Sequence, residues 1–485
     1  MNRTHSRLVL LLLTALLTLS ALSAQNTLQV FGSNEAQFIY RTAPDSLNAY
    51  FQDVFSFNIA YRNVRFGLKY IAELPRFSNN ESELIEDLSS DRLSSEWKEF
   101  YASYEQDKFL IHAGTITETF GSGINFRSWE DLELDEDNRI DGFLLKYDGK
   151  AKFKALYGSI ASPADESRSD LAYGADLQYP LHPWFSLGAS AVAYRTFYSQ
   201  FFDYNQQDVF GERVLINIGE FEGNAEYSIG KLYKFPGFGQ EGSAIHANAS
   251  YNLYPFQFGS AYKKYDQFYF RLQDLPMANN HSEPLSEEQS GADEEGLQGW
   301  LNWQILEDLS TSVDYAEAWN RKKDKKMNDL FTTLDYNIGN SFFGIEFSHI
   351  EKADDEHFSW QLERTPGFNA GFPFFGHILT LKSEYKYIEK KKIQDVTSHY
   401  EPKLQADYSL GKLSLSGSVK SHWTEPKELK SSVYWTNLEA RYRLFEHTDM
   451  TIFAGRDAGG KVCRNGTCRY VSPFQGLKLE LNTRF

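Results

Sequence analysis

Charged residues gather in one stretch of the chain, residues 117–139, which is also its most distinctive segment. Two close glycines, Gly121 and Gly123, allow the backbone to turn sharply there. An arginine among carboxylates is expected to form ion pairs, and a loop of this length can fold into a pore as a constriction. The alternative is an ordinary external loop, because loops are solvated by default. The candidate constriction residues are Glu118, Arg127, Glu130 and Asp131.

No local motif for metal-dependent or nucleophilic chemistry accompanies this segment. The histidines are spread singly, without a His-x-His or His-x-x-x-His pair, so a transition-metal site built from a local motif is not expected. The acidic run from Asp131 to Asp137 lacks the spacing of an EF-hand calcium loop. There is no Gly-x-Ser-x-Gly elbow, although a triad assembled from separate strands leaves no such motif. We therefore expect neither an enzyme nor a bound metal or cofactor.

The two cysteines flank a hairpin-like sequence. An Asn-Gly pair lies at its centre, and this dipeptide tolerates the positive φ angles of a two-residue type I′ turn. In such a hairpin Arg464 pairs with Thr467, and Cys463 lies directly opposite Cys468, close enough for a disulfide. If the tip is extracellular, it lies where thiols oxidise. The sequence therefore predicts a Cys463–Cys468 disulfide, with two free thiols as the alternative.

Most of the chain consists of short segments in which apolar and polar residues alternate. Residues 51–61, 400–410 and 434–444 each place large apolar residues on one face of an extended strand and polar residues on the other. Strands of a soluble sandwich also alternate. The 16% of aromatic residues favours strands whose apolar face meets a membrane, since aromatic girdles mark membrane barrels.

Short and long connections alternate between these segments. Short turns on one rim and long loops on the other are typical of bacterial outer-membrane barrels. Counting strand directions back from the C-terminus puts every short turn on the periplasmic side and predicts an antiparallel up-and-down β-barrel of about 24 strands, in a range of about 20–28. The count requires a short strand at 231–236. The short connections are 62–63, 105–107, 148–149, 179–183, 307–308, 338–340 and 410–412, and the long ones are 74–96, 117–139, 272–295, 321–328 and 424–431.

The composition of the 485 residues agrees with this fold class. A mean hydropathy of −0.49 rules out a bundle of transmembrane helices, and the net charge of −17 argues against nucleic acid as a partner. Residues 1–24 match a secretory signal peptide, with Arg3 and Arg7 before the apolar run Leu8–Leu19 and small residues near the cleavage site. The remaining residues, 25–485, are expected to form one barrel without a separate plug domain.

The C-terminal strand carries a second localisation signal. Alternating apolar residues that end on phenylalanine resemble the signal read by the outer-membrane barrel-assembly machinery, which we expect as a partner alongside the lipid bilayer. The residues of this assembly signal are Leu477, Leu479, Leu481, Thr483 and Phe485.

Residues 117–142 carry a sequence pattern that the alternation of apolar and polar residues in a barrel does not explain. It reads Phe-Gly-x-Gly from Phe120, then Phe-Arg-Ser-Trp-Glu from Phe126, then Asn-x-Ile-Asp-Gly from Asn138. This pattern resembles an uncharacterised family of outer-membrane proteins known as a domain of unknown function, in which tyrosine often stands at the Trp129 position. The wider resemblance runs from about Val30 into the middle strands. It implies a barrel in a bacterial outer membrane and implies no activity.

Two functions fit these expectations. Rows of polar residues of both signs at 382–386, 401–407 and 437–443 would face a wet lumen, which favours a porin-like channel for passive diffusion of small hydrophilic solutes. The alternative is a non-conducting structural or assembly barrel of a secretion or surface-polysaccharide system. Basic residues at 321–326 could pair with lipopolysaccharide phosphates. The alternative, expected for this run and for the acidic loop at 283–295 alike, is a solvated run of charge.

Overall fold

The computed structural model describes most of the chain beyond residue 27. The predicted signal peptide, 1–24, lies outside the described residues. The described residues are 28–485 without 43–48, 75–93, 132–135, 162–168, 199–202, 235–237, 286–290, 394, 425–432, 465–466 and 472.

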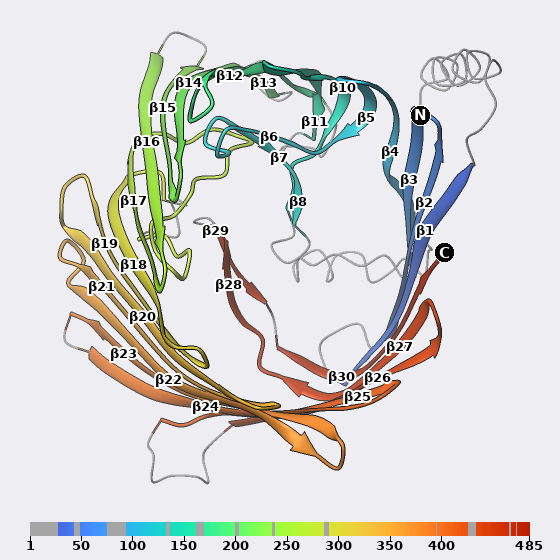
Figure 1. The fold of residues 1–485 in the computed structure, drawn as a ribbon, viewed down its shortest axis with the longest axis vertical. Helices are drawn as coiled ribbons and strands as arrows, with labels where there is room; N and C mark the ends of the chain where they lie inside the picture. The colour runs from blue at the N-terminus through green and yellow to red at the C-terminus, as the bar shows by residue number, and fades with distance from the viewer. Residues whose placement is uncertain are drawn as a thin grey trace.

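Within the described part of the chain, twenty-four strands form one antiparallel sheet that closes into a ring (Figure 1). These wall strands are β1 (Gln29–Arg41), β2 (Ala49–Tyr61), β3 (Val64–Leu74), β4 (Ser94–Gln106), β5 (Phe109–Ile116), β10 (Ile140–Asp148), β11 (Lys152–Ile160), β12 (Asp170–His182), β13 (Phe185–Tyr198), β14 (Asp203–Ile218), β15 (Phe221–Lys234), β16 (Phe238–Leu253), β17 (Phe256–Asp266), β18 (Glu294–Leu306), β19 (Leu309–Asn320), β20 (Lys325–Ile338), β21 (Ser341–Asp354), β22 (Ser359–Phe374), β23 (His377–Lys392), β24 (Asp395–Leu410), β25 (Leu413–His422), β26 (Val433–Phe445), β27 (Thr448–Asp457) and β30 (Phe474–Arg484).

Each wall strand pairs with the next wall strand along the chain, and β1 pairs with β30 to close the barrel. At this seam the Gly32 amide donates a hydrogen bond to the Phe485 carbonyl at 2.8 Å, and the Phe485 amide donates to the Gly32 carbonyl at 3.1 Å. A closed sheet leaves no unpaired edge, which a strand-built structure needs inside a bilayer. The predicted all-β antiparallel barrel of about 24 strands is confirmed. In the described part of the chain, no helix is both long and apolar enough to cross a membrane.

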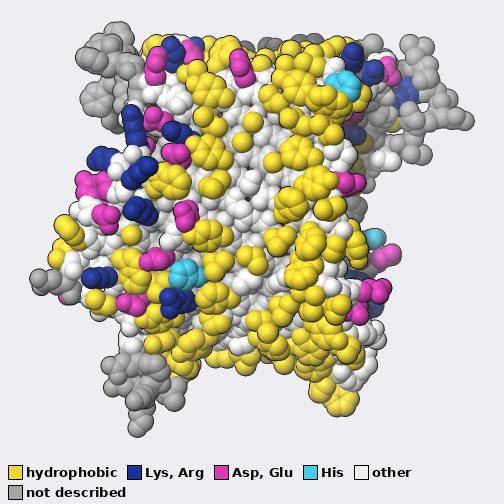
Figure 2. Space-filling model, turned by 60° about the vertical axis from the view of Figure 1, so that its left-hand side comes forward, with side chains coloured by type: hydrophobic (Ala, Val, Ile, Leu, Met, Phe, Trp, Pro, Cys, Tyr) yellow, Lys and Arg dark blue, Asp and Glu magenta, His cyan; other side chains and the backbone are white. Residues whose placement is uncertain are grey.

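The two faces of the wall differ in polarity, as the alternation predicts. On β10, Leu144 points inward and is 5% exposed, while its neighbours Phe143 and Leu145 point outward and are 56% and 39% exposed. Figure 2 shows the resulting outer surface, where apolar side chains cover the middle of the wall and charged side chains gather toward its two sides. An apolar belt between charged rims is typical of the outer surface of a membrane barrel.

Very short turns join the strands at one rim. Several of them place a glycine at positive φ, such as Gly339 at 57° and Gly411 at 62°, where other residues would be strained. Exposed aromatic residues next to these turns, including Trp184, Trp303 and Phe374, are placed like the aromatic girdle of a membrane barrel. The short strand expected at 231–236 is wrong, because β15 runs on to Lys234 and continues its pairing with β16.

Among the described residues, parts of three connections lie inside the outline of the ring in Figure 1. The first, insert 1 (residues 117–139), joins β5 to β10; the second, insert 2 (residues 267–293), joins β17 to β18; the third contains a hairpin between β27 and β30. A hydrophobic core fills the space between the two inserts and the inner face of β10–β17. The small strands of these connections are β6 (Glu118–Phe120), β7 (Phe126–Ser128), β8 (Glu130–Asp131), β9 (Glu136–Asp137), β28 (Gly460–Arg464) and β29 (Thr467–Val471).

Candidate functional site

Insert 1 is folded against the barrel wall. Its first half is a small hairpin in which β6 pairs with β7, and the rings of Phe120 and Phe126 lie 4.8 Å apart. Both rings and the Ile124 side chain are fully buried, in one cluster with Leu144 and Tyr194 of the wall. The expectation of an ordinary solvated loop is therefore wrong for this half, because three large apolar side chains would be costly to leave in water.

The two inserts hold each other through backbone hydrogen bonds. The Arg127 amide donates to the Leu272 carbonyl at 2.7 Å, and the Asp274 amide donates to the Gly123 carbonyl at 3.0 Å. Gly123 has a φ of 101°, a conformation that favours glycine. Arg127 also forms an ion pair with Asp274. The predicted constriction residue Arg127 thus fastens insert 1 to insert 2.

Glu118, the second predicted constriction residue, lies between insert 1 and the wall. Its carboxylate forms ion pairs with Lys154, at 2.9 Å, and with Lys146, and its side chain is 7% exposed. Burial alone would raise the pKa of Glu118, but hydrogen bonds from the two lysines hold this pKa below its ordinary value. Glu118 is therefore an ionised, compensated carboxylate that anchors β6 to β10 and β11.

Glu130 and Asp131 begin the second half of insert 1. Strand β8 pairs with β9, and Glu130 accepts hydrogen bonds from Arg139 at 2.8 Å and from Lys69 of β3 at 2.9 Å. The Arg139 guanidinium also contacts Asp137 at 2.8 Å and Glu99 of β4 at 3.2 Å. Asp131 is 4% exposed. Arg139 was not among the predicted site residues, because its only signal in the sequence was its place as a cation beside an acidic run.

Insert 2 is docked by a buried ion pair. Lys263 of β17 and Glu294 of β18 lie 2.6 Å apart with side chains 0% and 2% exposed. Glu294 also accepts a hydrogen bond from the Leu285 amide at 2.5 Å. The acidic loop was expected to be solvated, but Glu294 at its end is buried because a fixed lysine compensates its charge.

A hydrogen-bonded relay docks the same insert to β20 and β21. His281 Nδ1 lies 2.7 Å from the buried carboxylate of Asp329, and His281 Nε2 lies 3.0 Å from Ser348 Oγ. This is the order of a nucleophile, a base and an orienting carboxylate. However, Ser348 lies inside β21 between two paired strands, so the amides beside it serve the sheet and not an oxyanion. We interpret the relay as a clamp on insert 2.

The wall opposite the inserts presents polar side chains of both signs. On β22–β26 the row of inward residues includes Lys403, 3.8 Å from Glu384, and Lys420, 2.9 Å from Glu401. These side chains line a cavity of about 180 Å³ on the inner wall. The outward neighbour Leu404 is 51% exposed, so the charged rows face inward, as predicted.

The basic run at 321–326 is paired with acidic residues of adjacent connections. Arg321 lies 2.8 Å from Asp266, and Lys325 lies 3.5 Å from Asp354. Part of this positive charge is therefore compensated within the protein, and lipopolysaccharide as a partner stays a prediction.

The two remaining predicted sites have the expected backbone positions. In the hairpin β28–β29, Cys463 pairs with Cys468 and Arg464 with Thr467. The cysteine side chains lie outside the described part, so the disulfide stays a prediction. On β30, Leu477, Leu479 and Leu481 all point outward, and the Phe485 ring stacks on Phe55 at 6.2 Å. Their role as an assembly signal stays a prediction.

Solved structures with a similar fold are large barrels. One is an assembly intermediate of the P pilus tip from E. coli containing PapC, PapD, PapK and PapG; the TM-score is 0.59 at 9% identity, and the match covers 96% of this chain and 62% of that chain. Another is the siderophore receptor PirA from Pseudomonas aeruginosa, with a TM-score of 0.52 at 8% identity and coverage of 96% and 81%. At such identities the likeness shows the fold alone.

Family comparison gives a more specific result. No curated protein matches the chain. The profile of a family of unknown function (DUF6029) matches residues 4–286, which include β1 to β17, all of insert 1 and most of insert 2. The chain therefore belongs to this family of unknown function, in agreement with the resemblance found in the sequence.

Proposed function

We propose that the protein is a channel in the outer membrane of a Gram-negative bacterium, through which small hydrophilic solutes diffuse passively. The observation that carries the proposal is the polarity of the wall, which is charged with both signs inside and apolar outside. A barrel with such an inner face holds water, and water-filled barrels of this kind pass solutes. The signal peptide, residues 1–24, would export the chain, and the barrel-assembly machinery would insert it among lipid and lipopolysaccharide.

The inserts would narrow this channel in place of a separate plug domain. They cover the inner face of β10–β17, while the inward rows of β22–β26 line the opposite wall. The predicted constriction residues take part in this arrangement through Glu118 and Arg127, which fasten insert 1 to the wall and to insert 2. In this proposal they hold the constriction in place more than they form an open ring of charge.

The alternative function is a non-conducting structural or assembly barrel of a secretion or surface-polysaccharide system. The observation in its favour is the extent of the folded inserts inside the barrel. Their shared hydrophobic core includes side chains from eight strands of the wall. The pilus assembly intermediate that resembles this chain supports the fold only, and its role is not carried over.

Conductance in planar bilayers separates the two functions. We expect purified protein to give uniform conductance steps and to let liposomes swell in small sugars but not in large ones. Protein denatured by heat before reconstitution is the control. Reconstituted, correctly folded barrels that give neither conductance nor swelling would establish the non-conducting alternative.

A further inference from the structure

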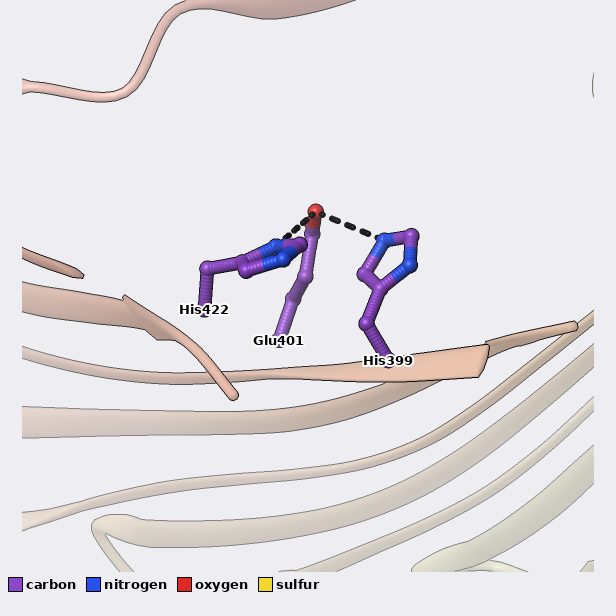
Figure 3. Close-up of side chains that lie close together, drawn as sticks. All are labelled: His399, Glu401 and His422. Atoms are coloured by element: carbon purple, nitrogen blue, oxygen red, sulfur yellow. Dashed lines mark ion pairs between the residues drawn. The ribbon is translucent and has the colours of Figure 1, made fainter. Parts of the chain in front are cut away.

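Two histidines and a glutamate converge on the inner wall at the end of β25. His399 and Glu401 lie two residues apart on β24 and therefore share a face. The pairs Lys403–Lys420 and Tyr400–Trp423 place Glu401 opposite His422. Figure 3 shows both imidazole rings and the carboxylate rising from the wall toward one point.

The distances within this trio suit a bound metal ion. Oε1 of Glu401 lies 3.4 Å from His399 Nε2 and 3.8 Å from His422 Nδ1, and the ligand atoms of all three residues lie within 4.8 Å of one another. Ligands about 2.0–2.1 Å from a tetrahedral zinc ion are about 3.3 Å apart. Small side-chain rotations would therefore bring the three atoms into coordination without movement of the strands.

The second oxygen of Glu401 has a different partner. Lys420 Nζ lies 2.9 Å from Oε2, which leaves Oε1 directed at the two histidines. A hydrogen bond of this kind holds a metal-binding carboxylate in one orientation, although the positive charge of Lys420 lowers the affinity of the site for a metal ion. Glu401 also borders the cavity of about 180 Å³, so water or a solute can reach the remaining coordination positions.

We propose that His399, Glu401 and His422 bind a zinc ion on the inner wall of the barrel. Two imidazoles and one carboxylate form a ligand set that zinc accepts, whereas calcium and magnesium prefer oxygen ligands alone. The three protein ligands leave one position for water or for a solute atom. The sequence lacks a local metal-binding motif because the ligands of this site come from two different strands. The proposal is independent of conduction.

The competing explanation is that the histidines are protonated and pair with Glu401 without a metal. Zinc titration of the full barrel, purified in detergent without a histidine tag, decides between them. Isothermal titration calorimetry should show one zinc ion per chain at pH 7.5. Binding should weaken as the pH is lowered, because protons compete with zinc for the imidazole nitrogens.

Single substitutions assign the site. His399→Ala and His422→Ala should each weaken zinc binding at least tenfold, and Glu401→Gln should weaken it measurably. His357→Ala is the matched control, because His357 lies in a turn and faces Asp354, and its binding should equal that of wild type. Heat-modifiable gel migration checks that each variant is folded. Absence of zinc binding in wild type, or binding retained in both His399→Ala and His422→Ala, would overturn the proposal.

Discussion

Substitution of Phe126 by alanine tests whether insert 1 limits passage through the barrel. Phe126 is fully buried, packs on Phe120, and lies beside the amide that joins the two inserts. Removal of a buried phenylalanine ring costs about 3–5 kcal/mol. The wall does not depend on this ring, because its 24 strands are closed by their own ladder. The lost free energy should therefore weaken the docking of insert 1 and leave the wall intact.

This free-energy cost predicts a measurable change in how readily a protease reaches insert 1. At about 1.4 kcal/mol for each factor of ten, the docking equilibrium should shift toward the open state by about 100-fold or more. Limited proteolysis with trypsin should cleave after Arg127 much faster in Phe126→Ala than in wild type. Phe143→Ala is the matched control, since Phe143 is 56% exposed on the outer face and touches no insert core.

Conductance measurements on the same variants then test whether docking of insert 1 limits passage through the channel. If the insert narrows the channel, Phe126→Ala should give larger or noisier conductance steps than wild type and Phe143→Ala. Faster proteolysis with unchanged conductance would show that the insert does not limit passage. Unchanged proteolysis would refute the packing argument itself.

The remaining predictions concern the clamp, the buried ion pair, the hairpin and the C-terminus. Burial alone would lower the pKa of His281, but its hydrogen bond to Asp329 raises this pKa above 6.5. The stabilisation from the His281–Asp329 contact should therefore be fully present below pH 6.5 and be lost as the pH rises through the raised pKa. Tryptic cleavage of insert 2 should then accelerate at high pH in wild type but not in His281→Asn. Lys263→Met should destabilise the docked insert by about 3–5 kcal/mol, because Glu294 is left buried and uncompensated. Thermal melting checks this prediction, and Lys264→Met, which changes an exposed lysine, is the control. The double variant Lys263→Met/Glu294→Leu should regain part of the lost stability, because it removes the uncompensated charge. Peptide mapping without reduction should recover Cys463 and Cys468 as one linked peptide, and two freely alkylated thiols would disprove the disulfide. Phe485→Ser should lower the yield of assembled barrel in the outer membrane while export across the inner membrane is unchanged, as measured by fractionation.

The wall could be predicted from the sequence because its information is local. A strand's side chains alternate strictly between two faces, so an apolar–polar period of two fixes which residues meet lipid and which face the lumen. The short connections, such as those that contain Gly339 and Gly411, mark where the chain reverses. Together these two signals give strand number and direction without knowledge of any distant contact.

The docking of the inserts inside the lumen could not be predicted in this way, because their contacts join residues far apart in the chain. Phe120 and Phe126 lie in a segment that the sequence also allowed to be a solvated loop, and only the folded barrel brings Tyr194 and Leu272 to them. His399 and Glu401 stand on one face of a strand, but their meeting with His422 depends on the register of β24 against β25. Register and loop docking are set by the balance of many weak contacts across the whole barrel. For this reason the sequence determined the wall, and the tertiary structure alone decided what lies inside it.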